Sequence, residues 1–332
     1  MENSSAFYKN STDSSEFGPI PVSVSVIVFI VLILCIVIGG IGNFSTMVTI
    51  VRLPDHPKSS YYLIASISAT HSLLCFFVMP VHMASLLVED HELGGGLCDY
   101  SAYAAAILTT TANLLLCATA LQRYISTMHP SCFGKVKSSK YTRGMIALSY
   151  LLPLMLFLVI KFAVLDEAPE YTPMDLNCKI ATSSLLNFLL PVLYAPSTLI
   201  MLCSYLMLFY KIKKMRSTVA PVQDNLEVST PTPMNDYIVK YQLRLTKTIF
   251  LILTEHCLTA ICPGFMWLAA ANSESDPRVL SILAILLMRM GPVFDVIIIL
   301  VGNKFLRFRI KNLYAHIFGY DSSDPNSINW AV

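Results

Sequence analysis

Four ionisable residues stand inside long apolar stretches of this chain: His71, Glu255, Arg289 and Asp295. A charge near the centre of a bilayer costs at least about 2.5–3.5 kcal/mol, so such residues face a protein interior or a cavity when they occur in membrane spans. Arg289 keeps its charge there and suits an anionic group such as a carboxylate or phosphate. These residues are the first candidates for chemistry.

Each candidate has an ordinary alternative. His71 and Asp295 could form a charge-assisted hydrogen bond, or His71 could stay neutral and bond to backbone or water. Arg289 could contact an anionic ligand, or it could pair internally with Glu255 or another acidic group. Glu255, followed by His256, could restrain its helix or simply pack with local hydrogen bonds. The sequence contains no metal-ligand spacing, phosphate loop or nucleophile arrangement, so we predict no enzyme, metal site or cofactor.

The elements that position these residues follow from the composition. Of 332 residues, 55% are hydrophobic and 13% are charged, against about 25% charged residues in ordinary soluble domains. Seven apolar runs reach the roughly 20 residues that cross a bilayer as a helix. They lie near residues 22–51, 60–88, 97–127, 142–165, 182–212, 245–271 and 277–302. We predict an all-α membrane protein with a seven-helix transmembrane bundle over residues 22–302.

The distribution of basic residues predicts the orientation of the bundle. Of the 23 Lys and Arg residues, 18 fall on the side of the membrane that holds the C-terminus. Because Lys and Arg concentrate in cytoplasmic loops, we expect the N-terminal tail, residues 1–21, outside the cell, at the plasma membrane. Residues 303–332 would lie inside. Topology explains the basic loops, and we predict no nucleic-acid partner.

The polar tail and the cysteines agree with this orientation. Asn3 and Asn10 begin Asn-X-Ser/Thr sequons in the tail, where glycosylation would occur. Asn43 also begins a sequon but lies within the first span, so we interpret it as a buried polar contact. Of nine cysteines, Cys98 and Cys178 remain on the oxidising side outside the spans, and we expect them to form one disulfide.

A short helix is expected after the seventh span. Leu306, Ile310 and Leu313 recur at helical spacing among basic residues. Such a segment lies at the membrane interface, with its apolar side chains in lipid and its charges near the headgroups. Membrane lipid is therefore a predicted partner of residues 303–332.

Several motifs then resemble one family, the rhodopsin-like (class A) G-protein coupled receptors. Cys98 precedes Arg123 of Gln122-Arg123-Tyr124 by 25 residues, the spacing of that family's third helix. The remaining motifs are Gly42-Asn43, Val78-Met79-Pro80, Ile261-Cys262-Pro263 and Asp295-Val-Ile-Ile-Ile299. Within the family, His71-Ser72 and the stretch 294–302 are similar to the orphan G-protein coupled receptor 141 group.

The resemblance implies an extracellular ligand and a heterotrimeric G protein as partners. It assigns activation or coupling roles to Arg123, Tyr124, Tyr205, Pro263 and Asp295, and a bundle polar network to Asn43, His71, Glu255 and Asp295. The family's acid beside the arginine is Gln122 here, which predicts basal signalling. His71 replaces the acid that helps to bind sodium in relatives, so we expect no sodium site.

The ligand is less well defined by the sequence. His82, Tyr103 and Trp267 fall near the outer helix ends and could line a ligand cavity with Arg289, although each could be an interfacial anchor. Ala105 stands where amine receptors carry an aspartate, which disfavours a biogenic amine. The competing functions are a retinal protein, a transporter, and a receptor-like partner without independent signalling. The stretch 285–293 contains no lysine for a retinal Schiff base.

Overall fold

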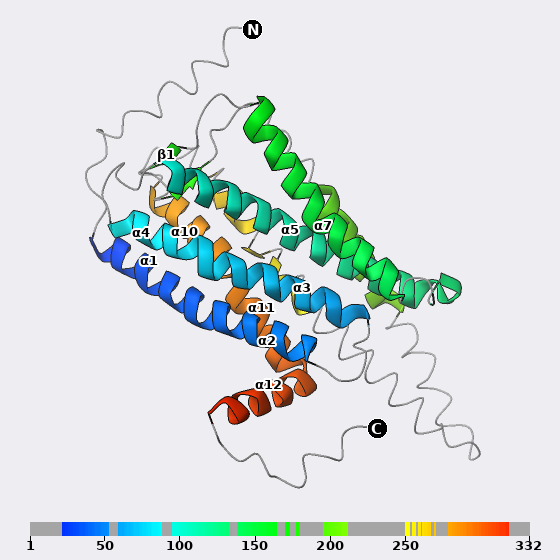
Figure 1. Cartoon of the computed structure of the whole chain (residues 1–332). Helices are drawn as coiled ribbons and strands as arrows, with labels where there is room; N and C mark the ends of the chain where they lie inside the picture. The colour runs from blue at the N-terminus through cyan, green and yellow to red at the C-terminus, as the bar shows by residue number, and fades with distance from the viewer. Residues whose placement is uncertain are drawn as a thin grey trace, which may run out of the picture.

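The first four membrane helices form most of the bundle. The computed structural model describes residues 22–52, 59–87, 95–132, 134, 138–164, 170–172, 177–179, 195–211, 250–252, 254–256, 258–259, 261–266, 269 and 278–318. The first span runs through α1 (Val22–Leu34), η1 (Cys35–Gly40) and α2 (Ile41–Val51). The second comprises α3 (Ser59–Leu73), η2 (Leu74–Val78) and α4 (Met79–Leu87), the third α5 (Gly95–Met128), and the fourth α7 (Ser139–Val159) with η4 (Ile160–Val164). Figure 1 shows these helices side by side.

Three further segments complete the bundle. Residues 195–211 are helical, and an apolar helix runs through Phe250–Met266. The last span consists of α10 (Arg278–Arg289) and α11 (Gly291–Gly302), separated by a turn at Met290. Five of the described helical stretches are long and apolar enough to cross a membrane. With the two shorter helices, the predicted seven-helix arrangement is confirmed.

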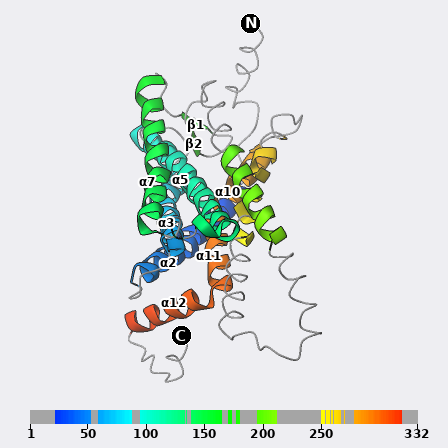
Figure 2. The ribbon, with the colours of Figure 1, turned by 90° about the vertical axis from the view of Figure 1, so that its right-hand side faces the viewer.

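The two ends of the bundle carry different small elements. Strands β1 (Glu170–Thr172) and β2 (Asn177–Lys179) pair antiparallel, with Tyr171 opposite Cys178. A short 3-10 turn, η3 (Pro130–Cys132), follows α5, and α12 (Lys304–Ile317) follows α11. Figure 2 shows β1 and β2 at one end of the bundle and α12 across the other.

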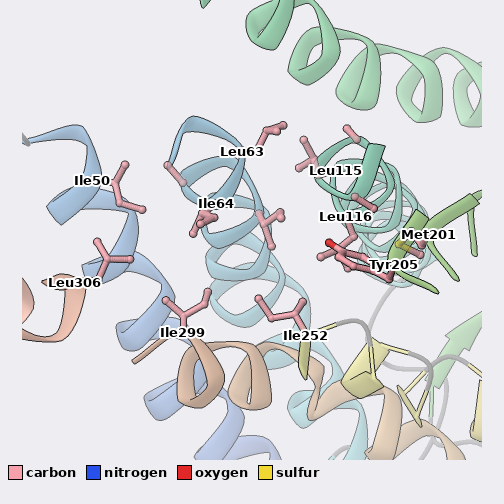
Figure 3. Close-up of a cluster of buried hydrophobic side chains, with 14 of the residues drawn as sticks. Ile50, Leu63, Ile64, Leu115, Leu116, Met201, Tyr205, Ile252, Ile299 and Leu306 are labelled. Carbon is pink, nitrogen blue, oxygen red and sulfur yellow. The ribbon is translucent and has the colours of Figure 1, made fainter. Parts of the chain in front are cut away.

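The main apolar core lies near the α12 end. Ile50, Leu63, Leu115, Ile299 and Leu306 are buried there in one cluster, which Figure 3 shows with its neighbours. Leu306 belongs to α12, so that helix is packed against the bundle. A second contact holds it there, because the hydroxyl groups of Tyr314 and Ser45 lie 2.6 Å apart.

Small residues let the first span approach its neighbours closely. A Cβ atom added to Gly42 would lie 2.6 Å from Cγ1 of Val296, and one added to Gly40 would lie 2.7 Å from Cε1 of Phe76. Membrane helices commonly pack through such small residues, because close backbone approach increases van der Waals contact. The first span is thereby held against both α11 and η2.

Candidate functional site

The structure brings His71 and Asp295 together inside the bundle. His71 lies in the last turn of α3, just before η2, and Asp295 lies on α11. Both side chains are buried. Nδ1 of His71 and Oδ2 of Asp295 are 3.2 Å apart, an ion-pair distance. Nδ1 has no hydrogen-bond partner, so the approach is poorly directed. The two groups are thus close enough to pair, and the charge-assisted hydrogen bond and the neutral His71 both stay predictions.

Glu255 joins this pair from the helix Phe250–Met266. Its buried carboxyl group lies near that of Asp295 and interacts electrostatically with it. A Cβ atom on Gly291 would lie 3.4 Å from Oε1 of Glu255, so the small residue leaves room for the carboxyl group against α11.

The next residue, His256, makes a second buried connection. Its Nε2 lies 2.9 Å from Oδ1 of Asn113, and Nδ2 of Asn113 donates to the hydroxyl of Ser197 at 2.6 Å. Because the amide oxygen of Asn113 can only accept, His256 is the donor, with its proton on Nε2. This chain of hydrogen bonds links Phe250–Met266 to α5 and to the helix 195–211.

Two adjacent side chains thus hold one helix to four others. Glu255 connects to α11 and, through Asp295, to α3, whereas His256 connects to α5 and the helix 195–211. Any outward displacement of Phe250–Met266 at this level would break both connections. The arrangement can therefore act as a switch between two positions of that helix.

Asn43 is the buried polar contact that its position in the first span predicted. Its amide nitrogen donates to the backbone oxygen atoms of Gly39, at 2.8 Å, and Pro292, at 2.9 Å. The second bond crosses from the first span to α11, three residues from Asp295. Asn43 therefore fixes the helix that carries the site.

Polar residues at the α12 end surround Arg123. The neighbouring Gln122 is buried and donates through Nε2 to the hydroxyl of Thr142 on α7, at 3.1 Å. Tyr205 is buried close enough to Arg123 to interact with its charge. Tyr124 packs edge-on against His129, with ring centroids 5.8 Å apart. Gln122 thus joins α5 to α7 through this hydrogen bond.

The predicted ligand-contacting residues occupy different surroundings. His82 is buried on α4. Tyr103 is buried on α5, and Nζ of Lys161 lies 5.1 Å from its ring centroid and 3.9 Å from Oδ2 of Asp99. This group joins α5 to η4. Tyr103 is thus held by a cation–π contact within the protein, which an interfacial anchor would not require.

Arg289, at the end of α10, is 5% exposed. Glu255, which the sequence offered as one possible internal partner, lies near Asp295. Among the residues that the structure describes, no carboxylate pairs with Arg289, and its Nε has no hydrogen-bond partner. The next residue, Met290, packs with Cys35 and Cys75 of the first and second spans.

Several predicted residues lie partly or wholly outside the described part of the chain. Asn3, Asn10 and Trp267 are outside it, and so are the side chains of Cys98 and Cys178. The strand β2, which contains Cys178, packs against α5, which contains Cys98. The disulfide stays a prediction.

Pro263 is buried within a described helical segment. Across the described residues, no three His, Cys, Asp or Glu side chains form a group that could hold a metal ion.

The sequence matches the family described as 7 transmembrane receptor (rhodopsin family) over residues 42–291. The chain belongs to this family. The matched region includes His71, Asn113, Arg123, Glu255 and Arg289. This rhodopsin-family chain is accordingly a multi-pass membrane receptor, and not an enzyme.

The individual proteins to which this chain is similar are distant in sequence. The tyramine receptor Ser-2 of Caenorhabditis elegans is 26% identical over 117 residues, which cover 35% of this chain and 26% of that protein. The 5-hydroxytryptamine receptor 1B of Cavia porcellus is 26% identical over 44% of this chain and 37% of its own length. The chain thus aligns with under two fifths of these relatives. Squid rhodopsin shares the fold, with a TM-score of 0.77 and 15% identity, over 92% of this chain and 84% of that structure.

Sequence reasoning missed the partners of several residues. Asn113 and Ser197 stand inside apolar runs, and the rule that marks buried charged residues as functional would extend to such amides and hydroxyls. Cys35 and Cys75 carried no such signal, because a free cysteine behaves as a small apolar residue. Their packing against Met290 depends on the arrangement of three helices, which the sequence does not give.

Proposed function

We propose that this rhodopsin-family receptor resides in the plasma membrane with its N-terminus outside, and passes an extracellular signal to heterotrimeric G proteins. The charge distribution supports this orientation, since the sequence assigns 18 of 23 basic residues to the side of the membrane that holds the C-terminus. Arg123, Tyr124 and Tyr205 at that side would line the cleft for the G protein. Pro263 and Asp295 would take part in the helix movement that opens it.

The observation that carries the proposal is the double connection made by Glu255 and His256. A ligand can shift a two-state receptor only through different affinity for the two states. Here the resting position of Phe250–Met266 is held by side chains of Asp295 and Asn113. A ligand that favours the displaced helix would overcome these contacts and open the cytoplasmic side.

The engagement of Gln122 supports basal activity. In the family that this chain resembles, an acid at this position restrains the arginine, and here Gln122 bonds to Thr142 instead. With Gln122 in place of that acid, the helix end that carries Arg123 would adopt the active arrangement more often. We therefore expect signalling without added ligand.

The ligand that we propose carries an anionic group, which Arg289 would bind. Bound ligand would supply the counter-charge that a buried guanidinium requires. His82, Tyr103 and Trp267 are the accompanying candidates. The names of the relatives indicate an amine ligand for each of the two described above, whereas this chain has Ala105 at the place of the amine-binding aspartate.

We also propose a finer placement within the family, in the orphan G-protein coupled receptor 141 group. His71-Ser72 and Phe294-Asp-Val-Ile-Ile-Ile-Leu-Val-Gly302 support it. His71 and Asp295, one from each stretch, lie 3.2 Å apart at their nearest side-chain atoms.

A surface-expression screen of G-protein activation tests the proposal. Wild type should signal above cells that lack the receptor, and Arg123→Ala should lose most of that signal at equal surface level. Arg143→Ala is the matched control, because Arg143 is exposed and bonds to the backbone of its own helix. Arg289→Ala should alter the signal, because it would change ligand occupancy or the balance between the two states of the receptor.

Two outcomes would contradict the proposal. Unchanged signalling in both Arg123→Ala and Arg289→Ala would remove the roles assigned to these residues. No signal from surface-expressed wild type, across all G-protein classes, would favour the receptor-like partner without independent signalling. The specific observation for that alternative is that Val296 and Ile299 are buried apolar residues where the family usually carries motif residues.

A further inference from the structure

Two hydrogen bonds join the helix 195–211 to α5, one deep in the bundle and one at its α12 end. Nδ2 of Asn113 donates to the hydroxyl of Ser197, and Nζ of Lys211 donates to the backbone oxygen of Thr127. The partners are 84 residues apart in the chain in both bonds. Each helix therefore advances equally between the two bonds, by about 21 Å at 1.5 Å per residue. The two helices run side by side and in register over that length.

Apolar packing fills the space between the two bonds. Met201, Tyr205 and Leu208 recur at helical spacing and are buried in one cluster with Leu115 and Leu116 of α5. Figure 3 shows Leu116, Met201 and Tyr205 next to one another. The helix 195–211 is thus held against α5 by polar bonds at two levels and by side-chain packing between them.

The contact of the helix 195–211 with Phe250–Met266 at the same end is of a different kind. The rings of Phe209 and Phe250 are stacked, with centroids 6.3 Å apart, and both residues are exposed. If these rings separated, each would exchange one apolar contact for another, because the surrounding lipid is apolar as well. The α12 end of the helix 195–211 is therefore held more firmly by α5 than by Phe250–Met266.

The position of Lys211 places its bond close to Arg123. Arg123 and Thr127 are one turn apart on the same side of α5. A side chain that reaches from the helix 195–211 to Thr127 therefore crosses the end of the bundle one turn beyond Arg123. An ammonium group there also stabilises the end of α5, because the last carbonyl groups of a helix carry partial negative charge.

We propose that Lys211 is a restraint that keeps the G-protein cleft closed by tying the helix 195–211 to the end of α5. This inference rests on the proposed function and names a residue that regulates the same site. In the family the acid beside the arginine provides a restraint, whereas Gln122 stands here and bonds to Thr142. Lys211 bonds to a backbone oxygen, so its restraint does not depend on the side chain at position 122. The bond must break before a partner reaches Arg123 between the two helices.

The bond can be tested without signalling, on purified receptor in phosphatidylcholine nanodiscs. Amide hydrogen exchange in the last turn of α5 should be about two- to fivefold faster in Lys211→Met, the factor expected when a helix end loses a stabilising cation. Lys211→Arg keeps a charged donor and should exchange nearly as slowly as wild type. Lys140→Met is the matched control, because Lys140 is exposed at the start of α7. Equal exchange in wild type and Lys211→Met would overturn the inference.

A measurement on wild type covers the case in which Lys211→Met fails to fold. An acetylating N-hydroxysuccinimide ester should modify Lys211 several-fold more slowly than Lys140, as read by mass spectrometry. The reason is that the bonded amine must first leave the carbonyl of Thr127. Equal rates at the two lysines would show that the amine of Lys211 is not held, and would contradict the restraint.

Signalling distinguishes a restraint from a bond that only stabilises the fold. Lys211→Met should raise the basal signal per surface receptor about two- to fivefold, whereas Lys211→Arg and Lys140→Met should leave it near wild type. An unchanged or lower signal in Lys211→Met, in cells where Arg123→Ala loses the wild-type signal, would reject the restraint and leave the proposed function standing. No signal from wild type or any variant would reject the proposed function and the regulatory role together, while hydrogen exchange would still decide whether Lys211 binds α5.

Discussion

At the scale of single residues, the bundle depends on a few polar side chains whose bonds cross between helices. Asn43 is fully buried and gives both amide hydrogens to backbone carbonyls, one in its own span and one at Pro292. Asn113 similarly uses its oxygen toward His256 and its nitrogen toward Ser197. Each such residue fixes the distance between two helices at one height.

Replacing Asn43 should lower stability without affecting the surface of the receptor. We expect Asn43→Leu to cost about 1–3 kcal/mol, because the Pro292 carbonyl loses a buried donor. The thermal unfolding midpoint of the purified receptor should fall by several degrees. Phe44→Leu, at the exposed neighbouring position, is the control. Equal midpoints for the two variants would show that the bond across the helices adds no stability.

The sequence could predict which residues were unusual but not which of them meet. His71, Glu255, Arg289 and Asp295 are conspicuous in apolar runs because burying charge is costly. The choice of Asp295 rather than Arg289 as the neighbour of Glu255 depends on the rotation and depth of Phe250–Met266. One sequence does not specify those quantities.

At the scale of the helices, close packing and polar contacts have opposite effects on helix movement. Gly42 lets α2 lie directly against Val296 of α11, and this contact is made by apolar packing alone. The helix Phe250–Met266 is instead held by Glu255 and His256, whose hydrogen bonds can be exchanged for others. The first span and α11 should therefore move as one unit, whereas Phe250–Met266 can separate.

Adding one methyl group at Gly42 should disrupt the first contact. The new Cβ would lie 2.6 Å from Cγ1 of Val296, and such overpacking typically costs about 1–3 kcal/mol. We expect Gly42→Ala to reduce surface expression. Gly144→Ala should have no such effect, because nothing lies within 4 Å of its added Cβ. If Val296→Ala fails to rescue Gly42→Ala in the double variant, the contact is not the cause.

Substitutions at Glu255 should distinguish the loss of its contact with Asp295 from the loss of its acidic group. Glu255→Gln can still donate to Asp295 and should keep basal signalling near wild type. Glu255→Leu removes the connection and should raise basal signalling roughly two- to tenfold, as a change of 0.5–1.5 kcal/mol implies. Thr254→Ala is an exposed control on the same helix. The measurement is signal per receptor at the surface; a decrease in Glu255→Leu would contradict the restraint.

At the scale of the whole molecule, the two ends of the bundle differ in charge and in small elements. The α12 end holds Arg123 and the basic residues of α12 itself, whereas β1 and β2 lie at the opposite end. Composition and run length sufficed to predict seven helices, because each run matches the thickness of a bilayer. The break of the last span at Met290 was not predicted, although Gly291 and Pro292 directly follow it.

The orientation can be tested through the N-terminal sequons. If residues 1–21 lie outside the cell, Asn3 and Asn10 should carry glycans, and wild type should migrate faster after glycosidase treatment. The double variant Asn3→Gln and Asn10→Gln should migrate like the treated wild type and be insensitive to the enzyme. Persistent sensitivity would place glycans elsewhere. An N-terminal epitope that antibodies reach only after permeabilisation would reverse the orientation.

The π-helical turns of the first two spans, η1 and η2, have a consequence for insertions and deletions in this chain. An α-helix advances about 100° per residue, so a single deletion rotates everything beyond it onto another face. Removing one residue from η2 would turn Cys75 and the whole of α4 relative to α3, although α4 itself would keep every amino acid. The length of the second span, counted to the single residue, is thus part of what packs Cys75 against Cys35 and Met290.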